Sequence, residues 1–321
     1  MPSYNRPTVL PRAVGAIFRQ QKAPSYEVII VDDGSNEATK KVLQKLKKKF
    51  PLRLLEQENA GPAAARNRGI AAARGKILLF IQDDIIAAPN FLAAHGEFHR
   101  RYPQQQYAAV GFTTWADYLT VTPFMHWLEH GGPQFDYDRL RAGEEADHLA
   151  FYTSNLSLKR AFVWPDSLMD ETLFTASGIS GYEDTEWGWR LQKKGLRLYY
   201  WPTAQAGHDH PQTLAQVCRR RYFLGRLSHL LFQRHPDFSW QGKRETWRYR
   251  WRYGKSGFLG EKWRYYLSFW LNCPGLMPFL RWLAEKAEKR YYWPLLYKLV
   301  CAYYYRRGRS EGPPAARLAE K

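Results

Sequence analysis

Short apolar runs alternate with helical patterns along the first hundred residues of the chain. Two of the runs are continuous rather than alternating, VIIV within 27–31 and ILLFI within 76–81, and residues 52–55 predict a short strand between them. Continuous runs of this length are typical of strands buried on both faces of a parallel sheet. Helical patterns lie before, between and after them: 6–20, from Ser35 or Asn36 to about Lys49, from Pro62 to Gly75, and from Pro89 onward. The order β-α-β-α-β predicts an α/β fold with helices covering a mostly parallel sheet.

The second half of the chain is less regular. Residues 152–160 predict a strand or its edge that leads into a short helix. Residues 183–194 have helical spacing and Gly195 is a stop signal, whereas 196–201 predict a late strand. From Pro211 onward the pattern is helical, aromatic and basic. We therefore predict an α/β domain over residues 1–210 and a C-terminal helical extension over 211–321.

Pairs of acidic residues follow two of the predicted strands and begin one helical pattern: Asp32-Asp33, Asp83-Asp84 and Glu183-Asp184. Open α/β sheets bind ligands beyond the carboxyl ends of their strands. Two carboxylate pairs at that edge favour a phosphate-bearing ligand bound through a metal ion. The third pair is then available for acid–base chemistry.

Charge and cysteine content narrow the class of protein. The formal net charge is +18, and residues 211–321 carry 23 Lys/Arg against 7 Asp/Glu, a net of +16. The three cysteines are too few and too scattered for a disulfide framework or a zinc site, which suits a reducing compartment: Cys218, Cys273 and Cys301. No signal peptide is visible, and the apolar stretch 291–305 is too short to span a bilayer. We expect a cytoplasmic protein, soluble or peripheral on the inner face of the membrane.

The motifs become specific when they are taken in order: YNRP (4–7), VDDGS (31–35), NAGPAAARNRGI (59–70), LLFIQDD (78–84), NLSLKR (155–160), GYEDTEWGWRL (181–191) and GHDHP…RRRYFLGR (207–226). Over roughly residues 1–230 this set resembles the family 2 glycosyltransferases. The resemblance implies a GT-A fold, a nucleotide-diphosphate-sugar donor, a divalent cation and inversion at the anomeric carbon. It implies a UDP-sugar as the donor, with dTDP- or GDP-sugars as alternatives.

The resemblance implies donor contacts at five residues: Tyr4, Asp32, Asp33, Arg66 and Asp83. Asp33 would accept the imide N–H of the base, Asp83 would contact the ribose, and Arg66 would bind a phosphate. Each has a simpler alternative. The segment around Asp33 can be a strand-to-helix turn with a cap, Tyr4 an ordinary packed tyrosine, and Arg66 part of a solvated helix face.

For the metal, the resemblance implies Asp84 and His208 as ligands of Mn²⁺ or Mg²⁺, with His210 as the alternative to His208. Gln82 stands where the fuller family motif has its first carboxylate. Oxygen ligands suit these ions. A metal here would neutralise the departing diphosphate.

Asp184 is the candidate catalytic base, because an acceptor hydroxyl must lose its proton as it attacks. Glu183 is expected to hold the acceptor or orient the loop. The alternative is that these acids stabilise a helix N-terminus through its dipole. Trp187 and Trp189 are candidates for stacking on an acceptor sugar, although core packing of at least one is the stronger expectation. Asn155 is assigned no definite role.

One departure from the family concerns the first strand, which should precede YNRP. Only Met1-Pro2-Ser3 stand before Tyr4, so we expect that the start is misassigned and that Met1 is an internal strand residue.

The basic extension allows two interpretations. Arg219 and Arg221 could contact a donor or acceptor phosphate, and the aromatic, basic segments beyond them are typical of helices at an anionic membrane surface. The alternative is a helical cap that packs its aromatic residues on the catalytic domain. The resemblance implies a saccharide or lipid-linked acceptor in cell-envelope polysaccharide synthesis. Two rival functions are nucleic-acid binding by the extension and an inactive GT-A protein that binds a glycan or a partner.

Overall fold

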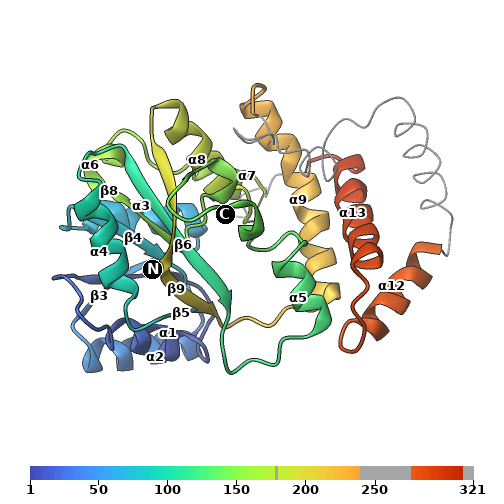
Figure 1. Ribbon diagram of the computed structural model, residues 1–321, viewed down its shortest axis with the longest axis horizontal. Coiled ribbons are helices and arrows are strands. Elements are labelled where there is room, and N and C mark those ends of the chain that lie inside the picture. Colours follow the sequence, from blue (N-terminus) through green and yellow to red (C-terminus); the bar gives the residue numbers. More distant parts are fainter. Residues whose placement is uncertain (178–179, 239–275, 314–321) are drawn as a thin grey trace. The chain divides into compact units, whose positions relative to one another are not determined.

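The computed structural model describes residues 1–177, 180–238 and 276–313, and the chain in these ranges forms two compact units (Figure 1). The first unit comprises residues 1–120 and 135–211, and the second comprises 121–134 and 212–313, each within the described ranges. The second unit therefore includes an internal segment, 121–134, that the sequence analysis assigned to the α/β domain.

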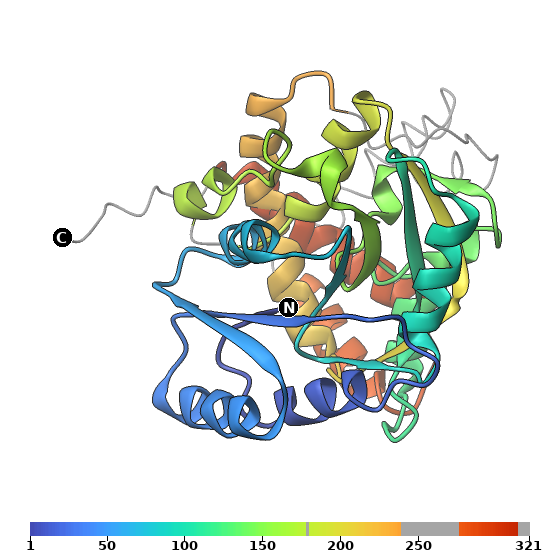
Figure 2. The same cartoon turned by 90° about the vertical axis from the view of Figure 1, so that its left-hand side faces the viewer.

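A parallel sheet of three strands begins the first unit, in the order β1-β2-β3. Its strands are β1 (Pro2–Ser3), β2 (Val28–Asp33) and β3 (Leu52–Gln57). The helices around it are α1 (Leu10–Ile17), α2 (Glu37–Lys49) and α3 (Pro62–Ala72). Figure 2 shows α1 and α2 on one side of these strands and α3 on the other. This two-sided cover explains why residues 28–31 are apolar throughout: Ile30 is fully buried.

The second sheet has six strands and is mixed. They are β4 (Ile77–Ile81), β5 (Ile85–Ala87), β6 (Tyr107–Trp115), β7 (Glu145–Ala146), β8 (Asn155–Lys159) and β9 (Arg197–His208). The order is β4-β8-β6-β9-β5, with β7 paired to β9. Only β6 and β9 pair in parallel among these described strands. The parallel arrangement that we predicted thus holds in the first sheet, whereas β4 pairs antiparallel with β8. An apolar run indicates burial, but the connections between strands decide the pairing direction.

Helices also cover the second sheet. They are α4 (Phe91–Arg101), α6 (Arg160–Val163), α7 (Thr172–Ser177) and α8 (Glu183–Lys193), with short 3₁₀ turns η1 (Tyr137–Arg139) and η2 (His148–Ala150). On α8, Trp187 is fully buried, and its Nε1–H donates to Ser167 O at 2.7 Å. Its ring meets Phe80 and Phe151 edge to face, each with centroids 5.5 Å apart. Trp187 therefore packs in the core and exposes no ring face to a ligand.

The helices of the second unit are α5 (Pro123–Glu129), α9 (Leu214–Arg234), α12 (Leu276–Ala287) and α13 (Pro294–Ser310). The backbones of α9 and α13 approach closely at Gly225, where an added Cβ would lie only 2.1 Å from Tyr305 O. Helix α5 packs on α13 through Phe124 and Tyr297, whose ring centroids are 5.1 Å apart. None of the described helices combines the length and apolar character needed to cross a membrane. The segments 247–258 and 261–271, and Cys273, lie outside the described residues.

A chain of buried polar side chains joins β8 to α4. Lys159 Nζ lies 2.7 Å from His99 Nδ1, and His99 Nε2 lies 2.8 Å from Ser157 Oγ. Ser157 Oγ lies 2.8 Å from His95 Nδ1, and His95 Nε2 lies 2.9 Å from Asn155 Oδ1. Because an ammonium only donates hydrogen bonds, the donors follow one direction from Lys159 to Asn155.

Asn155 ends this chain inside a bulge of the second sheet. Its Nδ2 donates to Phe112 O at 3.1 Å and to Ala204 O at 2.9 Å, where the register of β6 against β9 shifts. A Cβ added at Gly111 would lie 2.4 Å from Asn155 Oδ1. The structure therefore gives Asn155 a structural role that the sequence left open.

Candidate active site

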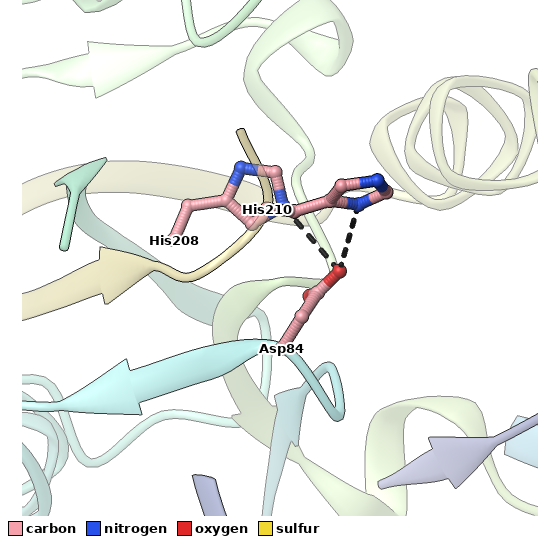
Figure 3. A group of neighbouring side chains, drawn as sticks. All are labelled: Asp84, His208 and His210. Carbon is pink, nitrogen blue, oxygen red and sulfur yellow. Dashed lines mark ion pairs between the residues drawn. The ribbon is translucent and has the colours of Figure 1, made fainter. Parts of the chain in front are cut away.

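Asp84 and two histidines meet where β5 pairs with β9 (Figure 3). Asp84 follows β4, and the ladder sets Ile85 opposite His208. Asp84 Oδ2 lies 3.5 Å from His208 Nε2 and 3.3 Å from His210 Nδ1. One ligand atom from each of the three residues fits within 4.8 Å of the others. The sheet thus brings together both predicted metal ligands and the alternative one.

Two atoms of this group lack partners. Asp84 Oδ1 and His208 Nδ1 are buried and have no hydrogen-bond partner among the described residues. Burial alone would raise the pKa of Asp84, but His208, His210 and Arg6 outweigh it and hold the pKa below its usual range. Asp84 is therefore a carboxylate, the form that binds cations.

Arg6 approaches the same carboxylate from the YNRP motif. Its Nη2 lies 3.5 Å from Asp84 Oδ2 and 3.3 Å from His210 Nδ1. The backbone before it is fixed, because Asn5 has a left-handed φ of 55° and bonds twice to the β2–α2 turn. The sequence analysis did not single out Arg6, although its motif was one of those that carried the resemblance.

Asp83, next to Asp84, is buried beside it. Burial raises the pKa of Asp83 to about 6, and the negative charge of Asp84 contributes in the same direction. Its Oδ2 has no hydrogen-bond partner among the described residues. The structure thus leaves one oxygen of this carboxyl group available to accept a hydrogen bond from a bound molecule.

The Asp32-Asp33 pair is engaged within the protein. Asp33 Oδ1 accepts from Gln57 Nε2 at 2.8 Å and from Ala60 N–H at 2.9 Å. Its Oδ2 accepts from Gly61 N–H at 2.9 Å and from the Asn59 side chain at 3.3 Å. Burial raises its pKa against these bonds. Asp33 therefore holds the 57–61 loop, and its contact with a base stays a prediction.

Asp32 is buried and accepts from Ser35 N–H at 3.2 Å. This bond closes the strand-to-helix turn that the sequence analysis weighed as the alternative reading of the VDDGS motif.

Asp184 and Arg66 form the second charged group. Arg66 Nη1, on buried α3, lies 3.6 Å from Asp184 Oδ1, and the Asp184 side chain is 27% exposed. Asp184 Oδ2 accepts from the backbone N–H and the hydroxyl of Thr153, at 3.0 and 2.7 Å. Glu183 is buried, and burial, followed by the charge of Asp184, raises its pKa. Of the two acids at the start of α8, Asp184 is thus the accessible one.

Residues 1–157 match the family model Glycosyl transferase family 2. This part of the chain belongs to that family. The relatives it matches are glycosyltransferases. Validoxylamine A glucosyltransferase of Streptomyces hygroscopicus subsp. limoneus is 29% identical over 231 residues, covering 62% of this chain and 48% of that protein. The uncharacterized glycosyltransferase YfnE of Bacillus subtilis (strain 168) is 34% identical over 100 residues, covering 31% and 26%. The chain spans about half the length of the first relative.

Two solved structures are similar to almost the whole chain, including the part that follows residue 157. The mannosyltransferase PcManGT from Pyrobaculum calidifontis, in a complex with GDP-Man and Mn²⁺, has a TM-score of 0.62 at 17% identity, covering 97% of this chain and 84% of that one. S. aureus TarS 1-349 has a TM-score of 0.51 at 15% identity, covering 96% and 86%. The fold is therefore GT-A with C-terminal helices.

The surroundings of four other predicted site residues do not indicate which ligand they would bind. Tyr4 is 49% exposed. Trp189 is half-buried with Lys193 Nζ 4.4 Å from its ring centroid. On α9, in the second unit, Arg219 is exposed and Arg221 lies 4.7 Å over the Tyr305 ring. These contacts assign no ligand to the four residues.

One further contact was missed from the sequence. Arg12 Nε donates to Asp209 Oδ2 at 2.8 Å, and its Nη2 contacts the same oxygen. Asp209 is buried between His208 and His210, and its N–H donates to Asp84 O at 2.8 Å. Arg12 thus fixes the backbone that carries both histidines.

Proposed function

We propose that the chain is a metal-dependent, inverting glycosyltransferase that moves a sugar from a nucleotide-diphosphate donor to a saccharide acceptor. The observation that carries the proposal is the convergence of Asp84, His208 and His210 in a family 2 region with a GT-A fold. One carboxylate oxygen and two imidazole nitrogens already lie within 4.8 Å of one another, as the ligands of one cation would.

The cation that fits these residues best is Mn²⁺. Asp84 and the two histidines offer one oxygen and two nitrogens, and imidazole is a better ligand for a first-row transition ion than for Mg²⁺. When bound, such an ion supplies positive charge that stabilises a departing diphosphate. The buried Asp84 Oδ1, without a partner among the described residues, supports this assignment.

For the donor we propose a UDP-sugar, with dTDP- or GDP-sugars as alternatives. Asp83 presents an oxygen without a protein partner among the described residues, which suits a hydroxyl of the ribose. Asp33 positions the 57–61 loop through its four accepted hydrogen bonds. Tyr4, in the YNRP segment, remains exposed enough to contact a base.

The base is Asp184 in this proposal. Thr153 orients its Oδ2 with two hydrogen bonds, which leaves Oδ1 beside Arg66. A carboxylate held in this way can take the proton of an attacking hydroxyl. Glu183, buried and with a raised pKa, supports the start of α8.

The acceptor that we propose is a saccharide, lipid-linked or in a cell-envelope glycan, met at an anionic membrane surface. The second unit offers the supporting observation. In the α12–α13 connection and the first turn of α13, four large residues are 44–72% exposed: Tyr291, Tyr292, Trp293 and Leu295. They lie between exposed basic residues, Lys289 and Arg290 before them and Lys298 after them. Aromatic and basic side chains together are typical of surfaces that bind anionic bilayers.

A thermal-shift screen of nucleotide sugars, with and without Mn²⁺, tests the donor and the metal together. We expect one nucleotide class to raise the melting temperature, and only with Mn²⁺ present. Stabilisation by nucleotides that is equal in the presence of a chelator would contradict the proposal. Flotation with vesicles containing phosphatidylserine tests the membrane surface separately, and absence of binding at low salt would remove it.

A further inference from the structure

One side-chain nitrogen contacts two of the three candidate ligand atoms. Arg6 Nη2 lies 3.5 Å from Asp84 Oδ2 and 3.3 Å from His210 Nδ1. A guanidinium can only donate hydrogen bonds, so His210 Nδ1 accepts from Arg6 in the tautomer that leaves this nitrogen without a proton, and in the other tautomer it donates to Asp84 instead. The lone pair that faces Arg6 is the one that a metal would use.

The surroundings allow the Arg6 side chain, but not its backbone, to move. The side chain is 33% exposed, so it can turn toward solvent without leaving a buried charge. The backbone is tied through Asn5, whose N–H donates to Ser35 Oγ at 3.0 Å and whose Oδ1 accepts from Asn36 N–H at 2.8 Å. Arg12 differs, because it bonds to Asp209, which is not among the candidate ligands.

We propose that Arg6 is a built-in counter-ion of the metal site, which a divalent cation must displace from Asp84 and His210 in order to bind. The positive charge of Arg6 then lowers the affinity of the protein for the metal. Two cations that share one carboxylate oxygen repel each other strongly at such distances, especially beside buried groups. The inference rests on the metal site of the proposed function, and it adds a residue that sets how tightly that site binds.

Titration of Mn²⁺ alone, followed by electron paramagnetic resonance of the free ion, tests this without nucleotide or acceptor. The proteins are the parent chain, Arg6→Gln, Arg6→Lys and, as a control, Arg197→Gln. Arg197 forms an exposed ion pair with Glu145 at the opposite end of β9 from His208. Thermal unfolding without metal establishes that each variant is folded.

We expect Arg6→Gln to bind Mn²⁺ about tenfold more tightly than the parent, because it removes a full charge that lies 3.5 Å from the ligand oxygen of Asp84. Arg6→Lys keeps the charge and should remain near the parent, and Arg197→Gln should match the parent. Equal or weaker binding by Arg6→Gln would overturn the proposal. Binding by Arg6→Lys as tight as that of Arg6→Gln would also overturn it, because charge would not be the cause.

The two proposals fail in different ways. If no protein in the series binds Mn²⁺, the metal site of the proposed function is wrong and the role of Arg6 falls with it. If the parent and Arg6→Gln bind Mn²⁺ equally, only the role of Arg6 is wrong.

Discussion

Acid should destabilise the first unit through two histidines outside the candidate active site. His95 and His99 lie buried in the polar chain between α4 and β8. Burial lowers the pKa of His95 to about 4, and burial with the charge of Lys159 lowers the pKa of His99 to about 2. In an unfolded chain a histidine has a pKa of about 6.5. As the pH falls, the unfolded state therefore binds more protons than the folded state, and the free energy of unfolding decreases.

The free energy can be worked out for His95. Because its folded pKa is lowered, its contribution to stability is complete above about pH 6.5 and is lost progressively down to about pH 4. At about 1.4 kcal/mol for each pKa unit, the loss amounts to about 3 kcal/mol. In the same window His99 adds a similar slope, because its ring stays neutral in the folded state.

Replacing His95 by Gln removes one titrating group but keeps a donor and an acceptor for Ser157 and Asn155. Urea unfolding of the parent and of His95→Gln, followed by circular dichroism from pH 7 to pH 4, measures the effect. The stability of the variant should fall less steeply with pH, by about 1.4 kcal/mol per pH unit. His126→Gln is the control, since His126 is exposed on α5 and lies outside the buried polar chain.

The reasoning is refuted if the parent and His95→Gln lose stability with the same slope. That result would mean that His95 already carries a second ring proton, and so a positive charge, in the folded protein near pH 5, which the donor order from Lys159 to Asn155 forbids.

Three further substitutions test the candidate active site. Asp84→Asn should lose the stabilisation by Mn²⁺, which for the parent is about 2.7 kcal/mol at a concentration of 100 Kd; an undiminished thermal shift would exclude Asp84 as a ligand. Asp184→Asn should lower turnover by about 10²–10⁴-fold with donor affinity unchanged, because Thr153 can still donate to the remaining oxygen; near-normal turnover would rule out Asp184 as the base. Gly61→Ala should cost about 2 kcal/mol or more, because Gly61 has a φ of 91° and a Cβ there would lie 2.3 Å from the Phe174 ring; an unchanged urea midpoint would contradict this.

Burial patterns predicted most elements of the first hundred residues. The strand at 27–31 and the helix that ends at Lys49 are present within two residues of the predicted bounds, because their apolar faces are covered by neighbours. Strand β6 was not predicted, since Gly111 and two threonines interrupt its apolar run. The pairing of β4 with β8 was also outside reach, because the sequence carries no mark of strand direction.

The site was predicted in part. Some contacts of the site residues were missed because the sequence does not show which groups meet in the folded chain. Asp84 and His208 were expected together through the family resemblance, and their meeting is seen at the β5–β9 ladder. The partners of Asp33 were missed, because two of them are the backbone N–H groups of Ala60 and Gly61. Backbone donors carry no signature of residue type. Arg6 was overlooked because the carboxylate that it contacts, Asp84, is 78 residues away in the sequence.

The route of the chain through α5 has a consequence for engineering. Phe124, Trp127 and Leu128 are buried, and Phe124 and Trp127 pack against Tyr297 of α13. A protein cut after residue 211 would therefore keep α5 but lose the helix that covers it, and would present bare aromatic rings to water. Grafting the C-terminal helices onto another transferase would meet the reverse problem, since the recipient would have to supply a matching α5 in the middle of its own chain. The extension cannot be exchanged as a cassette.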